Sequence, residues 1–265
     1  MNNVPVPRAQ YKCFEGTHVL ISGGAKGMGR AAALLFAQQG ARLSILDLDY
    51  EAAQETVEVI LELGGAAKAW AVDASIAAQV EGAISEAVEH FGKIDHLFNH
   101  AGIVTVGPLH SMNEEDFQKI FDINVKSAFL VCRNVVARMS ESGGGTIVVT
   151  SSISGERAFA LEALYNMTKA ATLMLTKSLC AEYRVKNIRA NAICPAFVRT
   201  QHGLKEIEDF AALGHPWDDS ALKDTQLRIC EPEEAAEAVL FLASDAASFI
   251  NGVGLTIDNG WCAIG

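Results

Sequence analysis

Residues 22–29 read Ser22-Gly-Gly-Ala-Lys-Gly-Met-Gly29, and they directly follow the apolar run His18–Ile21. The next ten residues, Arg30–Gln39, form a helix candidate that ends at Gly40. Glycine has no Cβ to block a sharp turn, and it lets backbone N–H groups come close to a ligand. A helix N-terminus adds unpaired N–H donors and partial positive charge. The stretch therefore predicts a strand–turn–helix unit that binds the diphosphate of a dinucleotide.

A carboxylate follows at the distance expected for a ribose ligand. Arg42–Asp47 has the pattern of a second buried strand, and Asp47 lies 18 residues beyond Gly29, close to the roughly 20 typical of such units. Asp47 accepts hydrogen bonds from ribose hydroxyls and repels a 2′-phosphate, and its neighbour Leu48 offers no compensating charge. Lys26 inside the turn supports the alternative, NADP, and a solvated strand end is the other interpretation of Asp47. The balance favours NAD.

Strand and helix patterns alternate along the rest of the chain. Such alternation predicts an α/β fold, a doubly wound parallel sheet with helices on both faces. No linker divides residues 1–265, so we expect a single domain. Further strands are predicted at Ala66–Val72, His96–Asn99, Thr146–Ser151, Ile188–Ile193 and Val253–Ile257, and further helices at Ala77–Phe91, Asn113–Met139, Ala163–Tyr183 and Glu233–Ala243.

Two segments fall outside this alternation. Residues 1–13 are expected to form a loose N-terminal arm. Residues 199–228 show no sustained helical periodicity and are punctuated by Gly203, Gly214 and Pro216. Irregular segments of this length in a compact domain are typically lids or binding loops, so we expect 199–228 to be a substrate-binding lid that orders when cofactor and substrate bind.

Bulk composition narrows the functional classes. The net charge of −11 argues against nucleic acid and anionic membrane partners. No apolar run is long enough for a membrane span, and the N-terminus lacks a signal-peptide core. Six scattered cysteines without a C-x-x-C pair predict reduced thiols in a cytoplasmic protein. His96 and His100 are four residues apart but fall on a strand that runs into a loop, so no metal site is expected.

A second group of residues indicates proton chemistry. Tyr165 and Lys169 are spaced i and i+4, which places them on one face of a helix. An ammonium near a phenol favours the phenolate, so Lys169 is expected to lower the pKa of Tyr165, together with a cationic nicotinamide. Ser152 ends the preceding strand, at the sheet edge where α/β proteins bind ligands. Its hydroxyl is positioned to meet the substrate oxygen that Tyr165 protonates.

With these motifs the chain resembles the short-chain dehydrogenase/reductase family, as an ordinary-length NAD-type member. The matching pieces span nearly the whole sequence. They are the 22–29 turn, Asp73, Asn99-His-Ala-Gly102, Asn124, Ser152, Tyr165-x-x-x-Lys169 and Pro195-Ala-Phe-Val-Arg-Thr200. The resemblance implies a Rossmann-type sheet of about seven parallel strands and an ordered path for a proton.

The family's site residues carry over by position. The resemblance makes Tyr165 the general acid/base, Ser152 the group that orients the carbonyl or alcohol oxygen, and Lys169 a ligand of the nicotinamide ribose. Asn124 helps to hold a water that relays the proton. The implied cofactor contacts are Ser22, Gly23, Lys26, Gly27, Met28, Gly29, Asp47, Leu48, Asp73, Ala74, Asn99, Ala101, Gly102, Tyr165, Lys169, Pro195, Val198 and Thr200.

Three positions depart from the family pattern. His100 replaces the second Asn of N-N-A-G, while Asn99 and Gly102 remain. Ala196 replaces the Gly that normally follows Pro195, which adds a methyl group near the nicotinamide. Ser22 replaces Thr and keeps the hydroxyl.

The substrate and the assembly are less defined by the sequence. Candidate pocket residues are Arg157, Phe159, His202, Phe210, His215 and Trp217. Arg157 is a candidate for a substrate carboxylate, with a surface or subunit contact as the favoured alternative. The resemblance implies a homo-oligomer, a tetramer or dimer built on Asn113–Met139 and Ala163–Tyr183, and the apolar tail Trp261–Gly265 is suited to burial in a neighbour.

Three functions are compatible with these residues. The first is an NAD-dependent dehydrogenase or reductase that interconverts a small secondary, cyclic alcohol and its ketone. The second is an NADPH-dependent biosynthetic ketoreductase of the carrier-bound 3-oxoacyl type, supported by Lys26. The third, a dinucleotide-binding scaffold, is disfavoured because a scaffold needs none of Asn124, Ser152, Tyr165 and Lys169 at these spacings.

Overall fold

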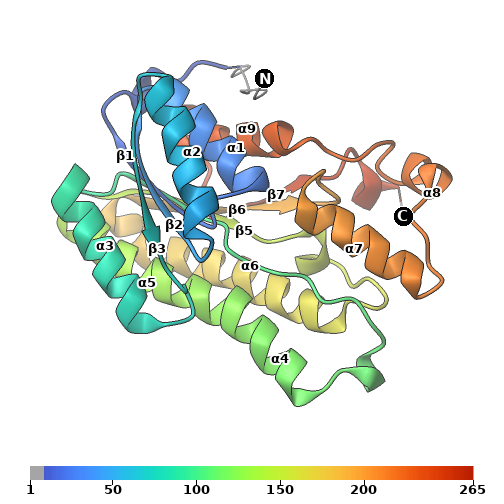
Figure 1. The fold of residues 1–265 in the computed structure, drawn as a ribbon. Coiled ribbons are helices and arrows are strands. Elements are labelled where there is room, and N and C mark those ends of the chain that lie inside the picture. Colours follow the sequence, from blue (N-terminus) through green and yellow to red (C-terminus); the bar gives the residue numbers. More distant parts are fainter. Residues whose placement is uncertain (1–8, 265) are drawn as a thin grey trace.

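A single parallel sheet forms the centre of the protein, seen in a computed structural model that describes residues 9–264 (Figure 1). Within these residues seven strands pair in the order β3-β2-β1-β4-β5-β6-β7, all in parallel. The strands are β1 His18–Ser22, β2 Arg42–Asp47, β3 Ala66–Ala71, β4 His96–Asn99, β5 Gly145–Thr150, β6 Ile188–Pro195 and β7 Gly254–Ile257. This confirms the predicted α/β fold.

Helices cover both faces of the sheet, as the strand pattern requires (Figure 1). Val19 and Ile21 face one layer and Leu20 faces the other, because successive side chains of a strand point to opposite sides. The first layer holds α1 Gly27–Gln38, α2 Tyr50–Glu62 and α9 Pro232–Ala243; the second holds α3 Ala77–Phe91, α5 Ser127–Glu141 and α6 Ala163–Tyr183. Helix α2 was not predicted from the sequence, although Asp49 is its N-cap and accepts a hydrogen bond from the Ala52 N–H.

The predicted helix over 113–139 is helical, but it contains a π-helical turn. Asn113 and Asp116 form a capping box at the start of α4 Glu114–Phe121. A π-helical turn, Asp122–Lys126, then leads into α5. Such a turn inserts one residue into the helix and re-aims its side chains. It carries the candidate site residue Asn124, which is 2 % exposed.

The segment 199–228 is not irregular, which corrects the sequence expectation. It contains α7 Gln201–Ala212, capped where Thr200 Oγ1 accepts from the Gly203 N–H, and α8 Asp219–Asp224, capped by Asp218. Both helices lie beyond one end of the sheet (Figure 1). Their apolar residues are spread over a short amphipathic face, so single-sequence periodicity understated them.

The described part of the N-terminal arm differs from the loose segment expected for residues 1–13. The Tyr11 N–H donates to Gln39 Oε1 at 2.8 Å, and Phe14 is fully buried against Phe36. Residues 1–8 lie outside the described part of the chain. No helix in residues 9–264 is long and apolar enough to cross a membrane.

Candidate active site

The strand order reverses between β1 and β4, and the Gly-rich turn of residues 22–29 lies at that point. Ligands of open α/β sheets bind in the crevice outside such a reversal. Ser22 and Asn99 end these two strands as register partners, and Ser22 Oγ donates to Asn99 Oδ1 at 2.7 Å. The backbone N–H of the next residue, His100, donates a hydrogen bond to the Ser22 carbonyl. The two motifs quoted from the sequence therefore form one structural unit.

Two glycines of this turn have no room for a side chain. Gly23 has φ +76°, and a Cβ there would lie 2.9 Å from the Ala101 backbone. A Cβ on Gly29 would lie 1.9 Å from the Gly23 carbonyl oxygen. A Cβ on Gly27 would lie 2.9 Å from Thr200 Cγ2, so the Thr200 side chain also reaches the turn.

Acidic side chains surround the far end of the turn. Asp47 ends β2, accepts from the Ala25 N–H at 2.9 Å through Oδ2, and accepts from the Asp49 N–H through Oδ1. Lys26 donates to Asp49 Oδ2 at 2.6 Å, so its charge is already paired. The Asp73 carboxylate, after β3, is held by the backbone and hydroxyl of Ser75. This end of the sheet is suited to hydroxyls more than to an added phosphate.

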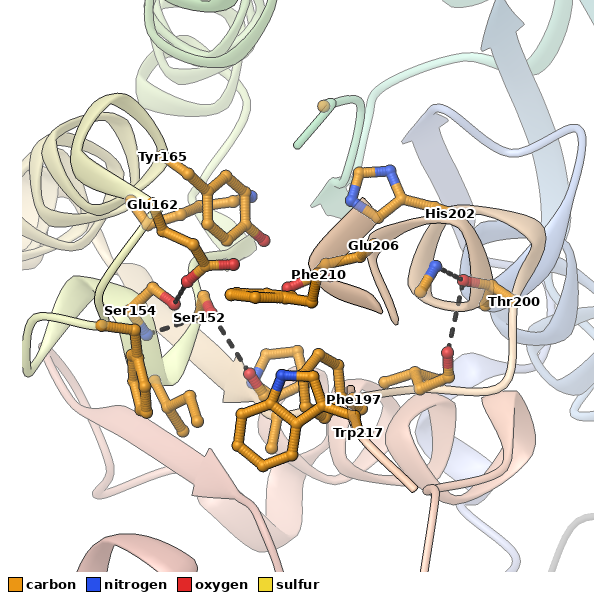
Figure 2. Close-up of a pocket in the computed structure, with 18 of the residues that line it drawn as sticks. Ser152, Ser154, Glu162, Tyr165, Phe197, Thr200, His202, Glu206, Phe210 and Trp217 are labelled. Atoms are coloured by element: carbon orange, nitrogen blue, oxygen red, sulfur yellow. Dashed lines mark hydrogen bonds between the residues drawn. The ribbon is translucent and has the colours of Figure 1, made fainter. Parts of the chain in front are cut away.

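The proton-transfer residues meet inside a cavity of about 840 Å³ (Figure 2). Ser152, Tyr165 and Lys169 line it together with Gly27, Met28 and other turn residues. Ser152 Oγ hydrogen-bonds to Tyr165 and to the Pro195 carbonyl, 3.3 Å away. Lys169 is buried, donates to the Thr150 carbonyl at 3.2 Å, and lies 5.4 Å from the centre of the Tyr165 ring.

The electrostatics of this cavity are those of the protein without a nicotinamide. The pKa of Tyr165 is then raised well above its usual value, by burial first and then by Glu206 and Glu162. The hydrogen bond from Ser152 acts in the opposite direction. Burial also lowers the pKa of Lys169 to about 8. The joint effect of Lys169 and a cationic nicotinamide on the pKa of Tyr165 stays a prediction.

Asn124 is buried and does not line the cavity itself. Its side chain bonds both the N–H and the carbonyl of Ile103, at 2.7 and 2.8 Å, and donates to Thr168 Oγ1. A Cβ on Gly102 would lie 3.2 Å from Asn124 Oδ1 and 3.6 Å from Lys169 Nζ. The π-helical turn thus brings Asn124 next to the Lys169 ammonium.

The other sequence-predicted residues divide between this cavity and the edge beside it. The cofactor candidates that line the cavity are Lys26, Gly27, Met28, Gly102, Tyr165, Lys169, Pro195, Val198 and Thr200. The remaining candidates do not line it and lie at or just beyond the carboxyl ends of β1 to β4: Ser22, Gly23, Gly29, Asp47, Leu48, Asp73, Ala74, Asn99 and Ala101.

All but one of the substrate candidates line the cavity, and their role in substrate binding stays a prediction. Phe159, His202, Phe210, His215 and Trp217 line the cavity. Arg157 does not. Its exposed guanidinium lies 5.4 Å from the Phe159 ring centre and contacts Cys262.

The aromatic wall contains residues that the sequence analysis missed or placed elsewhere. Trp261, expected in a neighbouring subunit, packs 5.2 Å from both Phe159 and Trp217 in its own chain. Phe197 lies 5.0 Å from Trp217. These ring-to-ring contacts join three segments far apart in sequence, and no local pattern signals them.

The largest omission is a pair of glutamates in the cavity wall, of which Glu162 is buried and Glu206 is partly exposed. Glu162 immediately precedes α6 and Glu206 lies on α7, and both line the cavity beside Tyr165 (Figure 2). Glu162 stands three residues before Tyr165 in an apolar stretch, which is the one available sequence signal. Glu206 lies on α7 beside the charged residues Lys205, Glu208 and Asp209, and no sequence signal distinguishes it from them.

Comparison with known proteins identifies the family. A family profile described as "Enoyl-(Acyl carrier protein) reductase", which belongs to the short-chain dehydrogenase/reductase family, matches residues 23–262. The chain belongs to the short-chain dehydrogenase/reductase family. It is an oxidoreductase that acts on alcohols and their carbonyl partners.

Three relatives are informative about this short-chain dehydrogenase. D-threitol dehydrogenase of Mycolicibacterium smegmatis is 35% identical over 94% of this chain and 94% of its own. Cyclopentanol dehydrogenase of a Comamonas species is 34% identical over 92% of this chain and 96% of its own. The crystal structure of NAD⁺-bound xylitol dehydrogenase superposes with a TM-score of 0.90 at 30% identity, over 93% of this chain and 99% of that one.

Proposed function

We propose that the protein interconverts a small secondary, cyclic alcohol and its ketone by hydride transfer to and from NAD. One observation carries this proposal: a single cavity joins Gly27 and Met28 of the turn to Ser152, Tyr165 and Lys169. The turn would hold the diphosphate of a dinucleotide, and Ser152, Tyr165 and Lys169 line the same cavity, so they would be within reach of its nicotinamide end.

The residues of the chain have separable roles in this proposal. When bound, the oxidised nicotinamide accepts the hydride, and its positive charge favours the Tyr165 phenolate. Tyr165 takes the hydroxyl proton of the alcohol and returns it to the ketone in the reverse direction. Ser152 holds the substrate oxygen by a hydrogen bond. Lys169 binds the ribose, and Asn124 holds a water that carries the proton away from the buried phenol.

The acidic end of the turn supports NAD over NADP. A 2′-phosphate at the ribose would face Asp47, with Asp49 close by. Lys26, the cation that favoured NADP, is already paired with Asp49 at 2.6 Å. Xylitol dehydrogenase, a relative of the same fold, is NAD⁺-bound in its structure.

The aromatic wall supports a small apolar ring as substrate. Phe197, Phe210, Trp217 and Trp261 enclose the space in front of Tyr165. The similarity to cyclopentanol dehydrogenase points to the same substrate class.

An NADPH-dependent 3-oxoacyl ketoreductase is the second candidate. The description of the family profile and the presence of Lys26 in the cavity lining favour it. The net charge of −11 opposes it, because acyl carriers are themselves acidic and are repelled at long range.

Turnover with defined substrates tests the proposal. Purified protein is mixed with NAD or NADP and a panel of cyclic and open-chain secondary alcohols, and the absorbance of reduced nicotinamide is followed. We expect reduction of NAD with cyclic alcohols at a kcat/KM at least about tenfold above that with NADP. Activity confined to NADPH and 3-oxoacyl thioesters would establish the second candidate instead.

We also propose a cytoplasmic homo-oligomer, a tetramer or dimer, formed through α5 and α6. Phe129 on α5 and Met167 and Met174 on α6 expose 47%, 49% and 59% of their surfaces. Exposed apolar residues gathered on long helices are typical of subunit contacts. Light scattering on the purified protein measures its mass, and a monomer at micromolar concentration would contradict the proposal.

A further inference from the structure

The cavity contains one polar feature that hydride transfer to a plain alcohol does not use. Glu162 is 3 % exposed, and its Oε2 accepts from Ser154 Oγ at 3.0 Å. Its other oxygen, Oε1, is buried, and no amide or hydroxyl in residues 9–264 donates to it. A buried carboxylate oxygen without a donor is costly in an apolar cavity. A donor for this oxygen has to come from the neighbouring Glu206 carboxyl or from a bound substrate.

Glu206 reaches the same position from the lid side. It hydrogen-bonds to Glu162 through the carboxyl groups, which requires one of the two to be protonated. Figure 2 shows the two side chains next to Tyr165 and Phe210, with Glu162 coming from the residue before α6 and Glu206 from α7. Burial raises the pKa of both carboxyl groups, which favours a proton held between them.

We propose that the Glu162–Glu206 pair binds a second hydroxyl group of the substrate, so that the preferred substrates are diols rather than plain alcohols. This inference rests on the proposed function and adds the substrate class to it. The shared proton lies between the two carboxyls, so their free oxygens are hydrogen-bond acceptors. A substrate hydroxyl can donate to such an oxygen without adding charge to the cavity.

The alternative ligand for two acids, an ammonium group, fits the site less well. An ammonium would bring a full positive charge into the cavity, whereas a hydroxyl brings none. It would also stand in the same cavity as Lys169 and the positive charge of an oxidised nicotinamide. Like charges in an apolar space repel strongly. A neutral hydroxyl avoids this cost.

The position of the pair gives the diol a defined orientation. Both carboxyls line the cavity beside Tyr165, the phenol that takes the reacting proton (Figure 2). The second hydroxyl therefore belongs to a carbon near the one that is oxidised. The aromatic wall opposite, including Trp217, covers the hydrocarbon part.

Matched substrates and variants test this inference. The kcat/KM of the wild type is measured with NAD for cyclopentanol, the vicinal cyclopentane diol and the vicinal amino alcohol. We expect the diol to exceed cyclopentanol by at least about tenfold, because a site built around a hydroxyl discriminates against analogues that lack it. In E206Q that ratio should fall by at least about fivefold, mainly through a higher KM for the diol. In E208Q, an exposed change on the same helix, the ratio should stay as in the wild type.

The possible results distinguish a failure of the diol assignment from a failure of the proposed dehydrogenase function. Equal or better turnover of cyclopentanol, an unchanged ratio in E206Q, or preference for the amino alcohol would each overturn the diol assignment while the dehydrogenase remains. No turnover of any alcohol would remove the proposed function and the assignment together. Should E206Q fail to fold, the ratios of the wild type and of E162Q decide the question, because a ratio between two substrates is insensitive to the fraction of folded enzyme.

Discussion

The Gly-rich turn of residues 22–29 and the aromatic wall around Trp217 bound the same cavity, yet they are built differently. The turn is a backbone device: Gly23 and Gly29 are glycines because carbonyl and backbone atoms occupy the space of a side chain. The wall is a side-chain device, in which Phe159, Phe197 and Trp261 come from three separate segments. A turn that is fixed by backbone contacts requires glycines at set intervals in the sequence. A wall of side chains from distant segments requires no such regular spacing.

The strongest test of the turn is G29A. A Cβ at this position would lie 1.9 Å from the Gly23 carbonyl oxygen, and neither backbone can yield without breaking the turn. We expect a loss of about 3 kcal/mol in the free energy of unfolding and loss of NAD binding. Urea denaturation and calorimetric titration measure the two effects.

G82A is the matched control. Gly82 lies within α3, and a Cβ there meets nothing within 4 Å. The change should stabilise the protein by up to about 1 kcal/mol through helix propensity. If G29A were as stable as G82A and still bound NAD, the turn would not be the rigid backbone device described above.

The next effect is a pH dependence at the junction of turn and sheet. Burial lowers the pKa of His100 to about 3, so the folded protein holds this imidazole neutral while the unfolded chain titrates near 6.5. Stability from this group is complete above pH 6.5 and is lost as the pH falls toward 3. We expect His100 to contribute roughly 2 kcal/mol of the stability lost between pH 7 and pH 5.

Denaturation curves of H100N at the two pH values measure that contribution. Asparagine is the residue that the family pattern carries here, and it does not titrate. H110N, at an exposed histidine, is the control and should keep the pH dependence of the wild type. A pH dependence in H100N equal to that of the wild type would show that His100 is not held neutral by burial.

The acidic end of the turn gives a smaller effect, in cofactor choice. D47A should weaken NAD binding about tenfold and so narrow the gap between NAD and NADP. D49N should strengthen NADP binding, because it releases Lys26 from its 2.6 Å ion pair toward a 2′-phosphate. Dissociation constants for both cofactors measure these changes, and equal constants in the wild type would refute the role given to Asp47.

The smallest effect is expected in the lid. Residues Gly203–Trp217 span most of α7 and the turn after it, and they carry Glu206, Phe210 and Trp217 into the cavity. They should exchange amide hydrogens faster than the core strands in the free protein, and slow when cofactor and substrate bind together. The turn should change little on adding substrate. Equal protection of Gly203–Trp217 in both states, at the level of β4 and β5, would exclude a lid.

The same contrast explains what the sequence could predict. The seven strands, the turn and the set Asn124, Ser152, Tyr165 and Lys169 follow from local patterns and fixed spacings. Helix α2 was missed because Asp49 was not recognised as its N-cap. Helices α7 and α8 were missed because their apolar faces are short. The Glu162–Glu206 pair and the place of Trp261 depend on contacts between distant segments, which a single sequence does not encode locally. The two acidic neighbours that raise the pKa of Tyr165 in the protein alone were missed for the same reason.

The Y165F variant tests the central claim most directly, because it separates NAD binding from proton transfer in one protein. The phenyl ring packs as the phenol does, but the transferable proton is gone. We expect the dissociation constant for NAD to stay within about twofold of the wild type while turnover of the best alcohol falls at least about a thousandfold. Turnover at the wild-type level, with NAD still bound, would contradict the account.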